Sequence, residues 1–182
     1  MLAQRCEAEI TAIDIHKESC IQAFDNKELS PWATKIQIKH ISLQELSSET
    51  TKFDLIISNP PFFNNSLKAG SIERNLARHN DQLSFRDLIF CSKNLLSENG
   101  KIALVLPIDA EATIQHEISE AGLYVTRRNN VADNPEKNTK RILLEIERNA
   151  KELIIEQLYI RDNSKEYSSE YKKLTTDFYL NF

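Results

Sequence analysis

Short apolar runs alternate with longer polar or amphipathic stretches along most of the chain. Four of these runs have the length of buried or half-buried strands, and they cover residues 10–15, 36–41, 53–58 and 101–106. We predict further strands over residues 123–131, 141–147 and 153–160. Apolar side chains recur with helical spacing in the segments between, which predicts helices over residues 18–26, 85–96, 111–121 and 168–179.

This alternation is typical of an α/β fold, with a mostly parallel sheet and helices on both faces. No repeat or low-complexity tract interrupts it, so we interpret residues 1–182 as a single domain. Ligands of such sheets bind at the carboxyl ends of the strands. Two predicted strands end there in polar residues, Asp14 and Asn59. The sequence therefore predicts a functional site at this edge of the sheet.

Composition narrows the class of protein. No apolar run approaches the roughly 20 residues of a membrane helix, and the first residues lack the layout of a signal peptide, so we expect a cytoplasmic protein without a membrane partner. The three cysteines are widely spaced, which predicts free thiols and no metal site. We favour a monomer.

The formal net charge of −4 argues against a general nucleic-acid coat, because binding to the backbone needs clustered lysine and arginine. Two local basic groups remain, and each is equally compatible with a solvated surface. The first comprises Lys68, Arg74, Arg78, His79 and Arg86. The second comprises Arg127, Arg128, Lys137, Lys140 and Arg141.

Asn59-Pro60-Pro61-Phe62 is the most informative motif. The nitrogen of an arylamine is a poor nucleophile, and its lone pair must be aimed at the methyl group of a sulfonium. The Asn59 amide oxygen and the Pro60 carbonyl can accept the two N–H bonds and leave that lone pair exposed. Two prolines stiffen the backbone, and Phe62 offers a flat face for a flipped base. Alternatively, the two prolines simply end a strand in a turn.

Residues 53–63, FDLIISNPPFF, resemble motif IV of amino-group methyltransferases. Together with the segments 30–32 (SPW) and 74–79 (RNLARH) and the tyrosine-rich C-terminal end, they resemble the bacterial tRNA1(Val) (adenine-37-N6)-methyltransferase family over essentially the whole chain. The resemblance implies a class I, Rossmann-like enzyme that uses S-adenosyl-L-methionine to methylate N6 of an anticodon-loop adenine in tRNA.

The resemblance also implies roles for single residues. Asn59, Pro60, Pro61 and Phe62 would hold the adenine. Asp14, Ile15, Ser42 and Asn59 would bind the cofactor. Ser42 stands where related sequences often have an acid that contacts the cofactor adenine, and its hydroxyl could still form a hydrogen bond. Three residues of the loop after Phe62 would contact tRNA: Arg74, Arg78 and His79.

One feature of the family is missing from the chain. Family members begin with a strand and a glycine-rich loop that wraps the methionine end of the cofactor. The chain has three glycines, Gly70, Gly100 and Gly122, and no G-x-G. We therefore expect an N-terminally truncated domain without the first strand, a gap between the strands that end at Asp14 and Asn59, and weak cofactor binding by this chain alone.

Two other functions remain open. The same acceptor geometry serves guanine N2 in ribosomal RNA or the amide of a protein glutamine, so the motif at Asn59 does not separate these targets from adenine. A third hypothesis is a non-catalytic remnant that binds only RNA or a partner.

Overall fold

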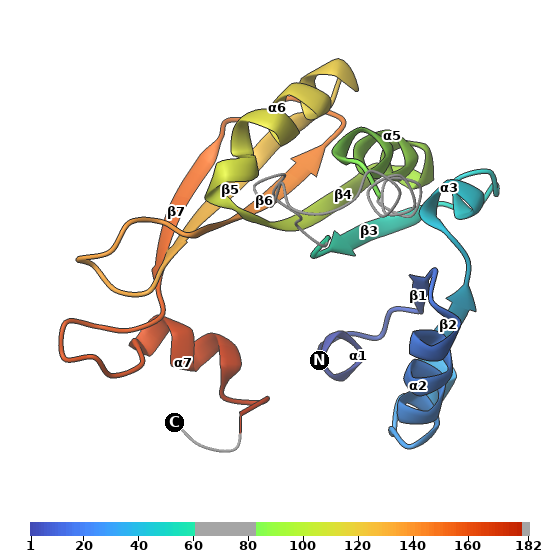
Figure 1. Ribbon diagram of the computed structural model, residues 1–182, viewed down its shortest axis with the longest axis horizontal. Coiled ribbons are helices and arrows are strands. Elements are labelled where there is room, and N and C mark those ends of the chain that lie inside the picture. Colours follow the sequence, from blue (N-terminus) through green and yellow to red (C-terminus); the bar gives the residue numbers. More distant parts are fainter. Residues whose placement is uncertain (61–82, 180–182) are drawn as a thin grey trace, which may run out of the picture. The chain divides into compact units, whose positions relative to one another are not determined.

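The computed structural model describes residues 1–60 and 83–179 (Figure 1). The chain divides into two compact units, Met1–Thr50 and Thr51–Phe182. We describe each unit by itself. Whether residues 1–182 act as one domain stays a prediction.

The first unit is a short βαβ arrangement with small helices around it. Strands β1 (Ile10–Asp14) and β2 (Ile36–His40) pair in parallel, and α2 (Lys17–Glu28) connects and contacts both. The remaining elements are α1 (Leu2–Arg5), the 3-10 turn η1 (Ala33–Lys35) and α3 (Leu43–Leu46).

The second unit is built on a five-stranded sheet in the order β3-β4-β6-β5-β7, in which only β6 runs antiparallel to its neighbours. Its strands are β3 (Phe53–Ser58), β4 (Leu96–Pro107), β5 (Tyr124–Ala132), β6 (Arg141–Glu147) and β7 (Ile154–Tyr159). Its helices are α5 (Phe85–Leu95), α6 (Glu111–Glu120) and α7 (Ser169–Thr175), with the 3-10 turn η2 (Ile108–Ala110).

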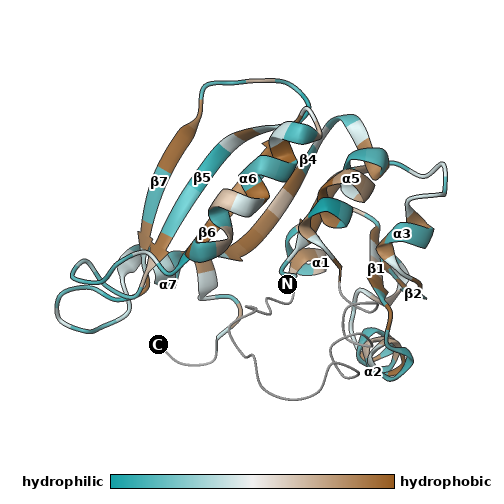
Figure 2. Ribbon diagram, turned by 45° about the horizontal axis from the view of Figure 1, so that its top comes forward, coloured by the Kyte–Doolittle hydropathy of each residue, from teal (hydrophilic) through white to brown (hydrophobic). Residues whose placement is uncertain are grey.

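The core of this unit lies between the sheet and helices α5 and α6, which Figure 1 shows on the same face. Alternate residues of the two central strands point into it and are at most 1% exposed: Ile102, Leu104, Leu106, Ile142, Leu144 and Ile146. Figure 2 shows apolar stripes along these elements. Alternation along the strands places the intervening residues on the other side, which we call the second face.

Most predicted elements are confirmed, and with them the α/β fold. Ser84 caps α5, as its position predicts, because its hydroxyl accepts from the Asp87 N–H at 3.0 Å. Gly122 follows α6 with φ of 66°, which is the left-handed C-terminal position that favours glycine. Gly100 instead lies beyond the end of α5, where a Cβ would meet the Phe53 carbonyl oxygen at 2.9 Å.

The apolar run over residues 53–58 predicts a buried strand, but β3 is only partly buried in the structure. Leu55 and Ile57 are 51% and 48% exposed. The reason is their position, because β3 is an edge strand whose sheet partner is β4 and both side chains lie on the second face. β1 and β3 belong to different sheets, and the expected gap between them stays a prediction.

Candidate active site

Asn59 and Pro60 directly follow β3, which is paired in parallel with β4 as far as Ser58 and Leu104. Asn59 is exposed, whereas Pro60 is buried. A buried proline has a fixed φ and needs no N–H partner, so it holds the backbone where the chain leaves the sheet. The backbone at Asn59 and Pro60 is therefore constrained at the end of β3, where we predict that the Asn59 amide and the Pro60 carbonyl act together.

Strands β3, β4, β5 and β7 all run in the same direction, so their last residues lie along one border of the sheet, which we call the carboxyl edge. Besides Asn59 and Pro60, this edge carries Pro107, the β5–β6 turn (residues 133–140) and the segment from residue 160 to 167. This is where ligands of parallel sheets bind.

The alternation along β3 also indicates the side on which Asn59 lies. Leu55 and Ile57 pair with Lys101 and Ala103 and face away from α5 and α6. Asn59 is the next position in this alternation, so it belongs to the second face. An exposed amide oxygen on this face can accept a hydrogen bond from a ligand without competition from the packed core.

Asp14 occupies the corresponding place in the first unit, at the carboxyl end of β1. One carboxylate oxygen accepts from the His16 N–H at 2.8 Å, and the other has no partner among residues 1–60 and 83–179. Ile15 is 46% exposed, and its carbonyl is hydrogen-bonded to the His40 ring at 3.0 Å. A fixed, exposed carboxylate of this kind fits the hydroxyls of a ribose.

Ser42 has a local role that the sequence analysis missed. Its hydroxyl accepts from the Glu45 N–H at 3.1 Å and donates to the Glu45 carboxylate at 2.7 Å, and the Ser42 N–H donates to the same carboxylate at 2.9 Å. These hydrogen bonds lower the pKa of Glu45. The arrangement is the capping box of α3, and the S-x-x-E spacing was the signal for it. The hydroxyl proton of Ser42 is thus already engaged.

Comparison with known proteins identifies the family. The model of an RMKL-like methyltransferase domain matches residues 2–106. A tRNA1(Val) (adenine(37)-N6)-methyltransferase from Bacteroides fragilis is 40% identical over 99% of this chain and 77% of its own length. One from Trichodesmium erythraeum is 37% identical over 100% of this chain and 78% of its own. The chain belongs to this methyltransferase family.

Solved structures agree on the fold. A predicted O-methyltransferase from Agrobacterium tumefaciens has a TM-score of 0.72 at 18% identity, over 96% of this chain and 81% of that one. A ribosomal protein L11 methylase from Lactobacillus delbrueckii has a TM-score of 0.53 at 20% identity, over 80% and 60%. The Rossmann-like methyltransferase fold is therefore confirmed, and S-adenosyl-L-methionine is the cofactor of the family.

Five predicted site residues fall outside the described residues. They are Pro61 and Phe62 of the motif, and Arg74, Arg78 and His79 of the loop that follows. Their roles stay predictions, as do those of Asn59, Pro60, Asp14, Ile15 and Ser42.

Some members of the second basic group predicted from the sequence form ion pairs within the fold. Arg127 donates to Glu156 at 2.8 Å and to Glu145 at 3.3 Å, and Arg128 is paired with Glu111. The hydrogen bond from Arg127 lowers the pKa of Glu156. Cross-strand pairing of this kind depends on register, which the sequence did not indicate. These two arginines are engaged within the fold.

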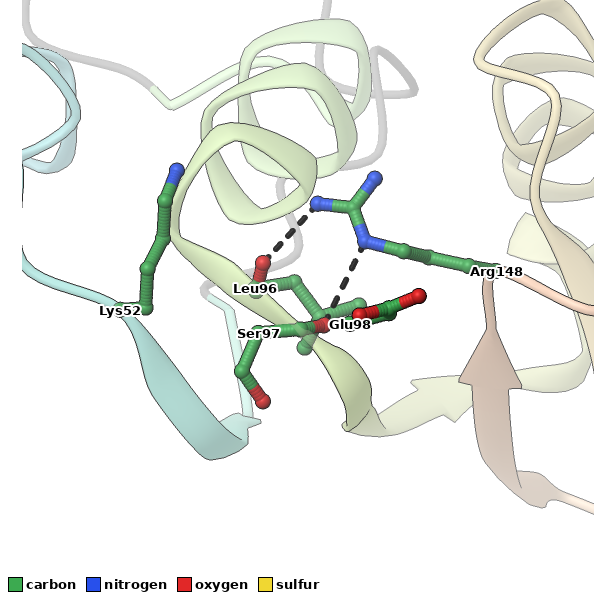
Figure 3. A pocket seen from close by; sticks show the side chains of 5 residues that line it. All are labelled: Lys52, Leu96, Ser97, Glu98 and Arg148. Atoms are coloured by element: carbon green, nitrogen blue, oxygen red, sulfur yellow. Dashed lines mark hydrogen bonds between the residues drawn. The ribbon is translucent and has the colours of Figure 1, made fainter.

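Figure 3 shows a shallow hollow at the opposite border of the sheet, the amino edge, lined by Lys52, Leu96, Ser97, Glu98 and Arg148. The Arg148 guanidinium donates to the carbonyls of Lys93 and Leu96 at 2.6 and 2.9 Å. Lys52 donates to the Asn94 carbonyl. Both cations thus donate to backbone carbonyls at the end of α5, so they contribute to the packing of the fold at this edge.

Neither a metal site nor a membrane-spanning helix is found among the described residues. Residues 1–60 and 83–179 contain no cluster of three or more histidine, cysteine, aspartate or glutamate side chains arranged to hold a metal ion. Among the helices of these residues, none is both long and apolar enough to span a membrane.

Proposed function

We propose that this chain transfers a methyl group from S-adenosyl-L-methionine to the exocyclic N6 of an adenine in tRNA. The observation that carries the proposal is the exposed Asn59 amide beside a buried Pro60 at the carboxyl edge. The names of the related proteins support adenine and tRNA as the target. Because tRNA is its substrate, we propose that the protein acts in the cytoplasm, and we keep the monomer as a prediction.

The chemistry needs positioning more than a strong base. The Asn59 amide oxygen accepts one N–H of the adenine amine, and the Pro60 carbonyl accepts the other. With both N–H bonds held, the nitrogen lone pair points away from the two acceptors. These dipoles are fixed before the reaction, so no reorganisation is required when positive charge develops on the nitrogen.

The cofactor supplies an electrophilic methyl group on a sulfonium. A nitrogen–carbon bond forms while the carbon–sulfur bond breaks, its electron pair returns to sulfur, and the amine proton leaves to solvent. The Asp14 carboxylate, with an oxygen free of partners in the described residues, is suited to hold the ribose hydroxyls of that cofactor. The Ser42 hydroxyl donates its hydrogen bond to the Glu45 carboxylate, so towards the cofactor it could act only as an acceptor.

The test is the identity of the methylated nucleoside. Because the chain has no G-x-G motif, calorimetry first measures its affinity for S-adenosylmethionine, and the assay is run above that Kd. The chain is then incubated with unmodified tRNA, and the tRNA is digested to nucleosides. N6-methyladenosine supports the proposal. N2-methylguanosine without N6-methyladenosine would overturn the adenine assignment, and saturated enzyme without any product would favour a binding-only remnant.

A further inference from the structure

The β5–β6 turn and the residue after it carry three exposed cations at the carboxyl edge: Lys137, Lys140 and Arg141. Over the residues that the structure describes, none of the three forms an ion pair. The acids of the same turn do not neutralise them: Asp133 lies 4.0 Å from Arg161, and Glu136 is exposed without an ion pair. The turn therefore presents positive charge to solvent.

Cations elsewhere on the same sheet are paired. Lys101 donates to Glu145 at 3.0 Å, a hydrogen bond that raises the pKa of Lys101. Arg127 lies between Glu145 and Glu156, so a row of alternating charges crosses β4, β6, β5 and β7 on the second face. The fold places acidic partners beside these cations, whereas within residues 1–60 and 83–179 no acid forms an ion pair with Lys140 or Arg141. This difference indicates that the latter two are available to an external anion.

The backbone beneath these cations is fixed. The Lys140 N–H donates to the Val131 carbonyl at 2.9 Å, and the Lys140 carbonyl accepts from the Ile108 N–H at 3.0 Å. Arg141 is in register with Pro107 on one side and Val131 on the other. Lys140 and Arg141 are thus held at the start of β6. Successive residues of a strand point to opposite sides, so Arg141 lies on the second face and Lys140 on the other side of the same edge.

The register also places Arg141 near the acceptor site. Arg141 shares the second face with Leu143 and Glu145, which is the face to which Asn59 belongs. β6 is two strands from β3. On β4, between them, the register places Asn59 beside Val105 and Arg141 beside Pro107, two residues further along. Strand spacing and rise per residue then give about 12 Å between the two Cα atoms.

A nucleotide whose base lies at Asn59 and Pro60 has a phosphate on each side of it. Lysine and arginine side chains extend several ångströms from the backbone, so they span much of this separation. Arginine binds phosphate through two parallel hydrogen bonds, and lysine binds it as a point charge. Contacts of this kind fix the position of a nucleic acid without reading its sequence.

We propose that Lys140 and Arg141, with Lys137 beside them, bind the RNA backbone next to the base that enters the acceptor site. This inference rests on the proposed function, because it takes the substrate to be RNA. It assigns to the β5–β6 turn the task of positioning the strand while Asn59 and Pro60 hold the amine. We expect substitutions here to raise KM for tRNA and to leave kcat at saturating tRNA nearly unchanged.

The experiment measures binding of fluorescently labelled, unmodified tRNA to the full chain, without cofactor, from 50 to 200 mM NaCl. Each phosphate contact contributes about 0.7–0.9 to the slope of log K against log salt, which corresponds to about five- to eightfold in affinity near 0.1 M. The double substitution Lys140→Gln/Arg141→Gln should therefore weaken binding about 25- to 60-fold and flatten the slope by about 1.5. Lys140→Gln alone should remove one phosphate contact and so weaken binding about five- to eightfold.

The matched control is Lys52→Gln, which removes one exposed charge at the amino edge and should leave the affinity and the slope unchanged. Arg141→Lys keeps the charge and should keep the slope. Unfolding midpoints of all variants verify that they are folded.

An unchanged slope and affinity in the double variant would overturn the assignment, and so would a wild-type chain that does not bind tRNA. If the wild type binds with the expected slope but forms no methylated nucleoside, the proposed function fails and the binding surface stands. If the wild type methylates adenine while the double variant keeps its affinity, only the surface is wrong.

Discussion

The positively charged side chains at the amino and carboxyl edges of the five-stranded sheet differ in their contacts with the rest of the fold. At the amino edge, Arg148 and Lys52 donate to carbonyl groups at the end of α5, and both residues line the hollow drawn in Figure 3. At the carboxyl edge, Lys140 and Arg141 form no ion pair within the described residues, and Asn59 is exposed at the same edge, two strands away in the sheet order.

This difference separates stabilising residues from binding residues of the same chemical type. A cation that donates to backbone carbonyls of the fold stabilises the folded state, and its loss removes those hydrogen bonds. A cation on a fixed backbone without a partner contributes little to stability, and its removal changes mainly the affinity for an anionic ligand. Variants of the two edges should therefore differ in the property that they change.

The largest effect is expected at Asn59. Asn59→Ala removes one of two fixed acceptors and should lower kcat by about 100- to 1000-fold, as expected for loss of a preset hydrogen-bond partner. Single-turnover methylation at saturating tRNA and cofactor measures it. Asn99→Ala, which changes an exposed asparagine near the start of β4 at the amino edge, is the control and should remain active. Near-normal turnover by Asn59→Ala would mean that the acceptor site lies elsewhere.

The second largest effect is the loss of tRNA affinity in Lys140→Gln/Arg141→Gln, and the third is expected at Arg148. Arg148→Ala should lower the free energy of unfolding by about 2–3 kcal/mol, because charged hydrogen bonds to the carbonyls at the end of α5 are lost. Denaturant titration measures this change, and Arg148→Lys should lose less. Affinity for tRNA should be unaffected below the melting temperature, and a selective loss of tRNA affinity would contradict the assignment of the amino edge.

Gly100 tests the packing of the amino edge without changing its charge. A Cβ at this position would lie 2.8 Å from Leu96 Cδ1 and 2.9 Å from the Phe53 carbonyl oxygen, so the chain must shift. Gly100→Ala should destabilise the protein by about 1–3 kcal/mol, as overpacked sites do. A melting temperature equal to that of the wild type would show that the contact between β3 and β4 is looser than described.

The smallest effect is a pH dependence from the paired charges of the second face. The hydrogen bond from Lys151 lowers the pKa of Glu147, and that from Arg127 lowers the pKa of Glu156. These carboxylates therefore stabilise the fold above their unfolded pKa of 4.5, and the contribution is lost as pH falls through their lower folded pKa values. Urea titrations from pH 7 to pH 3 should show a steeper acid loss for the wild type than for Glu147→Gln/Glu156→Gln. Parallel profiles would contradict this account.

Sequence patterns predicted most of the strands and helices and the position of the Asn59 motif at the end of a strand. The apolar run ending at Ser58 predicted β3, and Asn59 follows it at the carboxyl edge. The degree of burial could not be predicted in the same way. An apolar run is compatible with a central or an edge strand, and the exposure of Leu55 and Ile57 follows from sheet order, which local periodicity does not contain.

The charges illustrate the same limit. Arg127 and Arg141 belong to one basic group in the sequence, but only Arg127 has acids opposite it on the neighbouring strands. This pairing is decided by register across β6, β5 and β7, so it becomes visible only once the strands are aligned. Ser42 was different, because its capping role was present in local sequence spacing and was overlooked.

The exocyclic amine of adenine as acceptor is the central claim, and one substrate tests it most directly. In tRNA made with purine riboside at the adenosine that the wild-type chain methylates, the amine is absent and the rest of the base is retained. Transfer of labelled methyl from S-adenosylmethionine to that position should fall to background, while the adenosine-containing tRNA yields N6-methyladenosine. Continued methylation of the purine riboside would place the methyl group on a ring nitrogen and contradict the role of Asn59 and Pro60.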